Sequence, residues 1–293
     1  MHTDTPVSPV MRQLSSYMAG ALKRKLPAEV AERAKIHLVD TIAAIISGSR
    51  LLPGKRAIKY VESLGGKRDA GVLGTGIVTS APLAALANGT CAHADETDDI
   101  YSPTRSHPGA TNVPAALAMA ERQRLSGEAI LRALVLGYDI STRVVLALKQ
   151  DQVAAMGFHP SSKGGVFGAG AAAGALLKLD VRRMRSLLAY CGEQAAGILA
   201  LFQDSEHNEK AYVVGGMPAH NGVSAALMVA SGFTGGDDVF KGEGNFLSCF
   251  SPPMPIGKRW CAASGETMKS STAISSIGRS GGRYRPRCTC FAI

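Results

Sequence analysis

The chain has 293 residues, of which 46% are hydrophobic and 5% aromatic, enough for one large domain or two smaller ones. The formal net charge of +9 is concentrated at one end, because residues 255–293 hold seven Lys or Arg residues and one acidic residue, which leaves +3 for the other 254. This distribution argues against nucleic-acid binding, and no apolar run reaches the roughly 18 residues that a membrane-spanning helix needs.

The composition also indicates the fold class and the compartment. Alanine and glycine are abundant, whereas runs of β-branched and aromatic residues are scarce, which favours closely packed helices over sheets. Residues 1–9 are polar and lack the apolar core of a signal peptide, so we expect a cytoplasmic protein. Cys91, Cys191 and Cys249 are far apart and show no metal-ligand spacing, so we expect buried, reduced thiols.

Hydrophobic spacing and capping signals predict helices along most of the chain. The predicted helices cover residues 10–26, 28–47, 53–64, 81–90, 109–124, 126–149, 164–177, 181–201 and 218–231. Ser80 and Asp180 are the expected N-caps of the helices that follow them, and residues 70–76 are expected to form a brief extended piece or a loop. The sequence therefore predicts an all-α fold, with one large helical-bundle domain over residues 8–250 and a poorly structured tail after it.

The segment from His93 to His107 concentrates ionisable groups between apolar, alanine-rich helices. Besides its two histidines it carries four carboxylates, at Asp95, Glu96, Asp98 and Asp99. A buried pocket with these groups would suit general acid–base chemistry, whereas a solvated helix end would simply expose them to water. Composition alone favours neither interpretation. A divalent metal site is a third alternative, although the spacing matches no strong metal signature.

A second constellation lies at residues 157–168. His159 stands in a turn before a glycine-rich helix start whose backbone N–H groups could hold an anion, and Ser161 and Lys163 follow it. A third lies at residues 203–222, where His207 and Lys210 precede a glycine-rich bend and Lys210 could pair with a substrate carboxylate. Taken alone, the second segment is better interpreted as a helix connection with an incidental histidine, and the third as a solvated polar loop.

Seven short motifs nevertheless occur in one order along the chain. They are Ala87-Asn-Gly-Thr90, His93-x-x-Glu-x-Asp-Asp99, His107-Pro-Gly109, Gly157-Phe-His-Pro160, Val166-Phe-Gly-Ala169, Glu206-His-x-Glu-Lys210 and Gly216-Met-Pro-Ala-x-Asn-Gly222. Their order and spacing resemble the MmgE/PrpD family over residues 8–250. The family includes 2-methylcitrate dehydratase of propionate metabolism, cis-aconitate decarboxylase and an iminodisuccinate epimerase.

The resemblance implies a lyase that acts on a small di- or tricarboxylic acid such as 2-methylcitrate, without a metal or organic cofactor. It implies that His107 is the acid/base, and that positive charge for the substrate comes from His107, His159 and Lys210. The full set of implied catalytic residues is His107, Lys210, His159, Glu96, Asp98 and Asp99, and the implied substrate-binding residues are His93, Ser161, Lys163 and His207. Ile100 stands where some relatives place a site threonine.

The same resemblance implies a smaller α/β domain after the helical domain, and here the chain departs from the family. After about residue 265 it is rich in Ser, Gly and Arg and reads like an out-of-frame translation. We therefore expect residues 251–293 to be a frameshifted, disordered tail in place of the second domain, and activity to be weak or absent. Members of the family are commonly dimers, so a homodimer through the helical domain is expected, with neither nucleic acid nor membrane as a partner.

Two other functions stay open at this point. One is an isomerase or epimerase on the same scaffold, which removes and returns a proton without expelling a leaving group. The other is a non-catalytic helical remnant that serves only for dimerisation.

Overall fold

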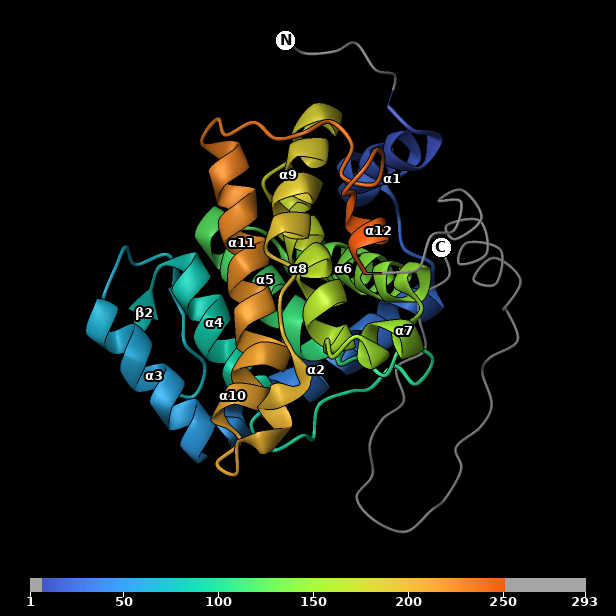
Figure 1. The fold of residues 1–293 in the computed structure, drawn as a ribbon. Helices are drawn as coiled ribbons and strands as arrows, with labels where there is room; N and C mark the ends of the chain where they lie inside the picture. Colours follow the sequence, from blue (N-terminus) through green and yellow to red (C-terminus); the bar gives the residue numbers. More distant parts are fainter. Residues whose placement is uncertain (1–6, 251–293) are drawn as a thin grey trace.

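Helix α8 (Pro160–Leu176) lies at the centre of the fold, and all 17 of its residues are buried (Figure 1). Helices α5, α6, α9 and α11 pack around it. Eight of the last ten residues of α8, residues 167–176, are alanine or glycine. The neighbouring helices can therefore approach its backbone, and small residues set the helix spacing. The computed structural model describes residues 7–250.

The predicted all-α fold is confirmed. In chain order the elements are α1 (Pro9–Gly20), η1 (Ala21–Lys23), α2 (Ala28–Gly48), α3 (Leu52–Leu64), β1 (Ala70–Gly71), β2 (Val78–Thr79), α4 (Ala81–Ala92), α5 (Pro108–Gln123), α6 (Gly127–Leu148), α7 (Gln150–Ala155), α8 (Pro160–Leu176), α9 (Val181–Glu193), η2 (Leu199–Gln203), α10 (Asn208–Ala211), η3 (Tyr212–Gly216), α11 (Met217–Ala230) and α12 (Phe246–Cys249). The tail predicted for residues 251–293 lies outside the described residues.

Three predicted helix boundaries are wrong, each for a local reason. The first helix ends at Gly20 and gives way to the 3₁₀ turn η1, after which Arg24 is extended. Helix α8 begins four residues before the predicted start, since Pro160 suits the first turn and His159 caps it. Helix α9 ends at Glu193 instead of continuing to residue 201, and Gly197 soon afterwards has a φ of 96°.

The two expected N-caps behave differently. The Asp180 side chain accepts a hydrogen bond from the Arg183 backbone N–H at 2.9 Å, as predicted. Ser80 occupies the N-cap position of α4, but its side chain makes no capping hydrogen bond. The short extended piece is a two-stranded antiparallel hairpin in which Ala70 pairs with Thr79.

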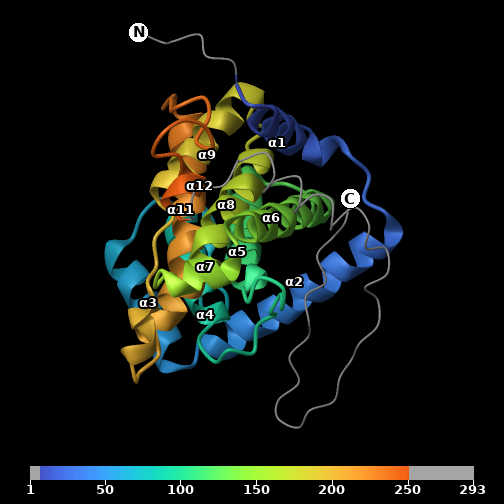
Figure 2. The ribbon, with the colours of Figure 1, turned by 45° about the vertical axis from the view of Figure 1, so that its right-hand side comes forward.

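Figure 2 shows the long helix α2 along the lower edge of the molecule, below α4 and α5. Helices α2 and α3 differ in direction by 85°. Within residues 7–250 no single helix has the length and apolar character needed to cross a bilayer, and these two meet that criterion only as a bent pair.

The crossing of α6 and α8 depends on glycine. A Cβ atom at Gly168 would lie 2.5 Å from the carbonyl oxygen of Gly137 and 2.4 Å from Oδ1 of Asn112, and one at Gly164 would lie 2.3 Å from the carbonyl oxygen of Ser141. Real Cβ atoms do not approach backbone oxygens this closely. The central helices therefore keep their separation only while these positions lack a side chain.

We predict that Gly168→Ala destabilises the protein by about 1–3 kcal/mol, because the added methyl group forces α6 and α8 apart. Gly127→Ala is the matched control: Gly127 is exposed at the start of α6 and its Cβ would meet nothing within 4 Å. The control should leave stability unchanged or raise it slightly. Urea unfolding of the three proteins measures both effects, and equal midpoints for Gly168→Ala and the wild type would contradict the packing argument.

Candidate active site

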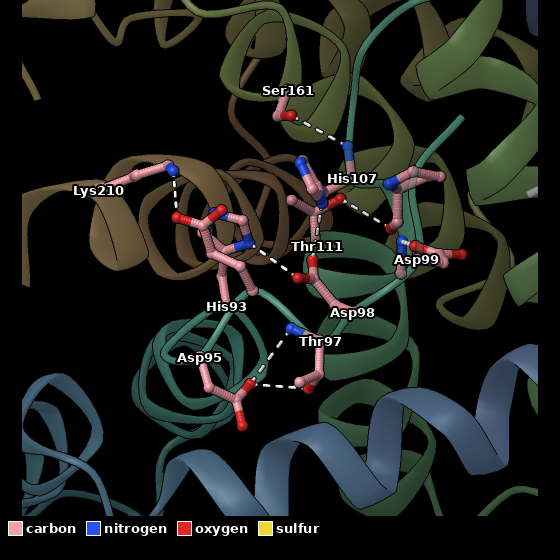
Figure 3. Close-up of polar contacts among 12 residues, drawn as sticks. His93, Asp95, Thr97, Asp98, Asp99, His107, Thr111, Ser161 and Lys210 are labelled. Carbon is pink, nitrogen blue, oxygen red and sulfur yellow. Dashed lines mark hydrogen bonds and ion pairs between the residues drawn. The ribbon is translucent and has the colours of Figure 1, made fainter. Parts of the chain in front are cut away.

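The ionisable segment joins two buried helices, α4 and α5, and its histidines stand at their ends. His93 is the C-cap of α4 and His107 is the N-cap of α5. Between them lies Asp98, which is fully buried. His93 Nδ1 lies 2.9 Å from Asp98 Oδ1, and His107 Nδ1 lies 3.2 Å from Asp98 Oδ2, so one carboxylate joins both imidazoles (Figure 3). The three side chains are thus buried and paired with one another, which a solvated helix end would not be.

The electrostatics of this triad favour a carboxylate between two imidazoles. Burial opposes ionisation of Asp98, but His93 and His107 outweigh it and hold the pKa of Asp98 well below its ordinary value. Burial lowers the pKa of His93, although Asp98 acts in the opposite direction. The lowered pKa of Asp98 and the lowered pKa of His93 are both consistent with an ionised Asp98 that accepts a hydrogen bond from Nδ1–H of a neutral His93. The same bond would hold the tautomer of each imidazole.

The neighbouring residue, Asp99, is bonded to a different part of the fold. Its carboxylate accepts hydrogen bonds from the Tyr138 hydroxyl at 2.7 Å and from the Gly109 N–H at 2.8 Å, and it lies 3.2 Å from Nδ1 of His37. These partners belong to α6, α5 and α2. Although Asp99 was expected to be catalytic, its contacts join three helices beneath the pocket, which favours a positioning role.

Sequence reasoning missed His37. It lies on α2 among apolar residues at helical spacing and is buried. The one signal for it was its place at a core position, where an ionisable side chain needs a polar partner.

Lys210 and Glu96 form an ion pair across the pocket (Figure 3). Burial raises the pKa of Glu96, but Lys210 outweighs this and lowers it to about 2. His207 lies 3.6 Å from the same carboxylate, and its Nε2 lies 3.1 Å from the backbone oxygen of His93. Glu96 and the segment that carries His207 and Lys210, more than a hundred residues apart in the sequence, therefore meet beside the triad.

The backbone around this ion pair is unusual. Glu96 and His207 adopt left-handed conformations with φ of 55° and 64°, and the chain after Lys210 forms the π-helical turn η3. Such conformations are uncommon outside glycine and concentrate at functional sites. A Cβ on Gly215 would lie 2.0 Å from the Gly89 carbonyl oxygen, so η3 packs directly on the backbone of α4. This close approach brings Lys210 to the end of α4.

His159 completes the group of expected residues near the triad. Its Nδ1 accepts the backbone N–H of Ser161 at 3.3 Å, and the Ser161 Oγ accepts the backbone N–H of His107 at 3.0 Å. Burial lowers the pKa of His159 to about 3, and a proton on His107 acts in the same direction. His159 is therefore a neutral imidazole at neutral pH, which differs from the cation that the sequence led us to expect.

Lys163 lies apart from these groups, although it was expected to bind substrate. Its Nζ donates to the Ala195 carbonyl oxygen at 2.5 Å and sits over the rings of Phe158 and Phe250, 3.9 and 4.2 Å from their centroids. Burial lowers the pKa of its ammonium to about 8. These protein partners favour a structural role. Asp95, at the rim, accepts hydrogen bonds from the hydroxyls of Ser47 and Thr97.

Two sets of three side chains in the described part of the chain bring potential metal-ligand atoms within 4.8 Å of one another. One is the triad His93, Asp98 and His107, and the other combines His93 with Glu96 and His207. The triad's imidazole Nδ1 atoms already engage the Asp98 carboxylate. Coordination of a metal by these Nδ1 atoms would first have to replace their contacts with Asp98.

We predict that acid weakens the fold through His159. Its pKa is lowered in the folded state, so the unfolded chain binds an extra proton below its ordinary pKa of about 6.5 and stability falls as pH drops toward 3. His159→Asn keeps a side-chain acceptor at the N-cap of α8 but removes this proton. Between pH 6 and 4 the variant should lose stability less steeply, by up to about 1.4 kcal/mol per pH unit.

Urea midpoints at several pH values measure the two slopes. Parallel slopes for the wild type and His159→Asn would show that the buried imidazole does not stay neutral.

Comparison with known proteins assigns the sequence to a family. The chain is 30% identical over 258 residues to a cis-aconitate decarboxylase-like protein, oryM, of Aspergillus oryzae. The aligned region covers 84% of this chain and 52% of that protein. The chain is 26% identical over 253 residues to the cis-aconitate decarboxylase of Aspergillus terreus, covering 83% and 50%. For the human cis-aconitate decarboxylase the identity is 27% over 231 residues, covering 76% and 47%.

The chain thus spans about half the length of the curated relatives that it matches. Residues 12–257 match the model of the MmgE/PrpD N-terminal domain. This range includes the triad, the Lys210–Glu96 ion pair and His159, and we conclude that the chain belongs to the MmgE/PrpD family.

Proposed function

We propose that this chain carries the proton-transfer site of a lyase, a dehydratase or decarboxylase, that acts on a small di- or tricarboxylic acid. The observation that carries the proposal is the buried Asp98 carboxylate held between His93 and His107. A histidine paired through Nδ1 with a carboxylate is oriented, and its Nε2 is available for proton transfer. The names of the relatives support decarboxylation or dehydration as the reaction class.

His107 is the proposed acid/base. In a dehydration, its Nε2 lone pair would take the proton from a carbon next to a carboxylate, the C–H electrons would form the double bond, and hydroxide would leave with a proton. In a decarboxylation, carbon dioxide would leave and the electrons of the broken C–C bond would stay on the substrate. Protonated His107 would then give its proton to the resulting carbanion. Both reactions use one positioned acid/base and need Asp98 to stabilise the imidazolium.

Lys210 is the proposed partner of a substrate carboxylate. Its ammonium is paired with Glu96, which is ionised at neutral pH because its pKa is about 2. A substrate carboxylate would therefore compete with Glu96 for Lys210, or share it. His159, as a neutral imidazole, would contribute a hydrogen bond instead of a charge.

The choice of substrate is the finer part of the proposal. The relatives' names favour cis-aconitate, and 2-methylcitrate is the alternative expected from the sequence. Removal and return of a proton without loss of a group, as in an epimerase, would use the same first step. The cytoplasmic location and the homodimer stay predictions.

We predict that His107→Gln lowers turnover at least about 100-fold, because it removes the positioned acid/base. The wild-type chain and the variant are each incubated with cis-aconitate or 2-methylcitrate in deuterated water. Nuclear magnetic resonance follows the substrate and the product. Decarboxylation gives a product with one deuterium incorporated, and dehydration gives an unsaturated product without it, so either product supports a lyase. Deuterium exchange at an intact substrate supports an epimerase. Neither turnover nor exchange with any di- or tricarboxylate, together with no binding, would contradict the proposed function.

We also predict that Lys210→Met weakens binding of cis-aconitate at least about tenfold, because a charge-assisted hydrogen bond to a carboxylate is lost. Lys59→Met is the matched control, since Lys59 is exposed on α3 and has none of the contacts of the pocket. Isothermal titration calorimetry measures both, and it reports on binding even if turnover is slow. Equal affinities for the two variants would remove Lys210 from the substrate site.

A further inference from the structure

Beside the triad, a second group of side chains brings together atoms that can bind a metal ion. His93, Glu96 and His207 each place one such atom within 4.8 Å of the other two. His93 ends α4 and His207 precedes α10, so the group joins segments that are 114 residues apart in the sequence. The proton transfer proposed for His107 leaves the imidazole of His207 and one ring nitrogen of His93 without a task.

The hydrogen bonds of the two imidazoles determine which nitrogen of each ring carries its lone pair. Nδ1 of His93 lies 2.9 Å from the Asp98 carboxylate (Figure 3), so in the neutral ring Nδ1 carries the hydrogen and Nε2 the lone pair. Nε2 of His207 lies 3.1 Å from the backbone oxygen of His93. A carbonyl oxygen can only accept, so the neutral His207 ring has its lone pair on Nδ1. Histidines that bind metals almost always donate their other N–H to a carboxylate, a carbonyl oxygen or water, as these two do.

The lone pair of His93 is buried and has no partner. The residue is 1% exposed, and its Nε2 makes no hydrogen bond in the part of the chain that the structure describes. A buried acceptor left without a donor costs about 1–3 kcal/mol. A cation bound at Nε2 would remove this cost.

The other two ligand atoms already have the separation that a tetrahedral ion requires. Nδ1 of His207 lies 3.6 Å from Oε1 of Glu96. Two ligand atoms that are each about 2.1 Å from a tetrahedral zinc ion lie about 3.4 Å from one another. The side chains of Glu96 and His207 are 29% and 26% exposed, which gives an ion a path from solvent. Two imidazoles and one carboxylate suit zinc and similar transition metals, whereas Mg²⁺ and Ca²⁺ prefer oxygen ligands alone.

We propose that Nε2 of His93, Nδ1 of His207 and the carboxylate of Glu96 form a binding site for one divalent transition-metal ion of the zinc class. Water completes the tetrahedral coordination. The ion competes with the ammonium of Lys210, which is paired with the same carboxylate. Binding of the metal therefore releases Lys210 from Glu96. Metal binding does not depend on the proposed lyase function.

Isothermal titration of Zn²⁺ into the full chain tests the three ligands. Cys288→Ser with Cys290→Ser is the common background, because thiolates two residues apart would bind zinc on their own. Glu96→Gln and His207→Gln should each raise the zinc dissociation constant at least about 100-fold, since each removes one ligand of three. His220→Gln is the matched control and should leave it unchanged, because His220 lies on α11 outside both groups of potential ligands.

Lys210→Met gives a result that misfolding cannot imitate. It removes the competing ammonium, so the zinc dissociation constant should fall at least about tenfold. The same variant is expected to bind cis-aconitate more weakly, so the metal site and the proposed function can fail separately. The proposal is overturned by a chain that binds no Zn²⁺ at tens of micromolar, by a zinc affinity that Lys210→Met leaves unchanged, or by zinc binding that survives both Glu96→Gln and His207→Gln. Zinc binding that is lost in His107→Gln and kept in His207→Gln would place the ion in the triad and overturn it too.

Discussion

Burial of two adjacent carboxylates is the constraint on which the site depends. Asp98 and Asp99 follow one another in the segment between α4 and α5, and neither carboxylate is exposed to solvent. Each has to find its own partners, because desolvated charge without them costs several kcal/mol. Asp98 meets the histidines at the ends of α4 and α5, while Asp99 meets Tyr138, Gly109 and His37. The contacts of Asp98 and those of Asp99 together hold the loop between α4 and α5 in place, and they position His107 at its end.

Small residues make that arrangement possible. A glycine-rich helix is intrinsically weak, and its stability in this fold comes from contact with neighbours. Gly168 lets α6 approach α8, and Gly215 lets η3 rest on the backbone of α4 at Gly89. The second contact also matters for the chemistry, because it brings Lys210 to Glu96 from a segment more than a hundred residues away. The helix packing and the position of Lys210 thus both depend on glycines at close backbone contacts.

The sequence predicted the helices well, since a hydrophobic row at 3.6-residue spacing depends only on local order. It failed where an element depends on distant contacts. The start of α8 at Pro160 and the turn η3 both lie against other helices, and neither segment shows a helical spacing of hydrophobic residues in the sequence. Among the site residues, His93, His107, Glu96 and Lys210 were found as a set. Which of Asp98 and Asp99 faces the histidines was not predictable, because the answer lies with Tyr138 and His37 on other helices.

The charge balance of the pocket constrains how it can accept an anion. Around the triad, Asp98, Asp99 and Glu96 contribute three carboxyl groups, while the ammonium of Lys210 pairs with Glu96. His159 adds no charge, because its pKa is about 3. A di- or tricarboxylate would therefore meet a pocket that repels it until an imidazole takes up a proton. Asp98 favours that proton on His93 or His107 by joining both. If the negative charge of a bound substrate favours a proton on His107, then binding itself converts His107 into the acid that later donates that proton. The buried carboxylate is then the group that couples the two events, and this explains why it stands between the histidines and not between the lysine and the substrate.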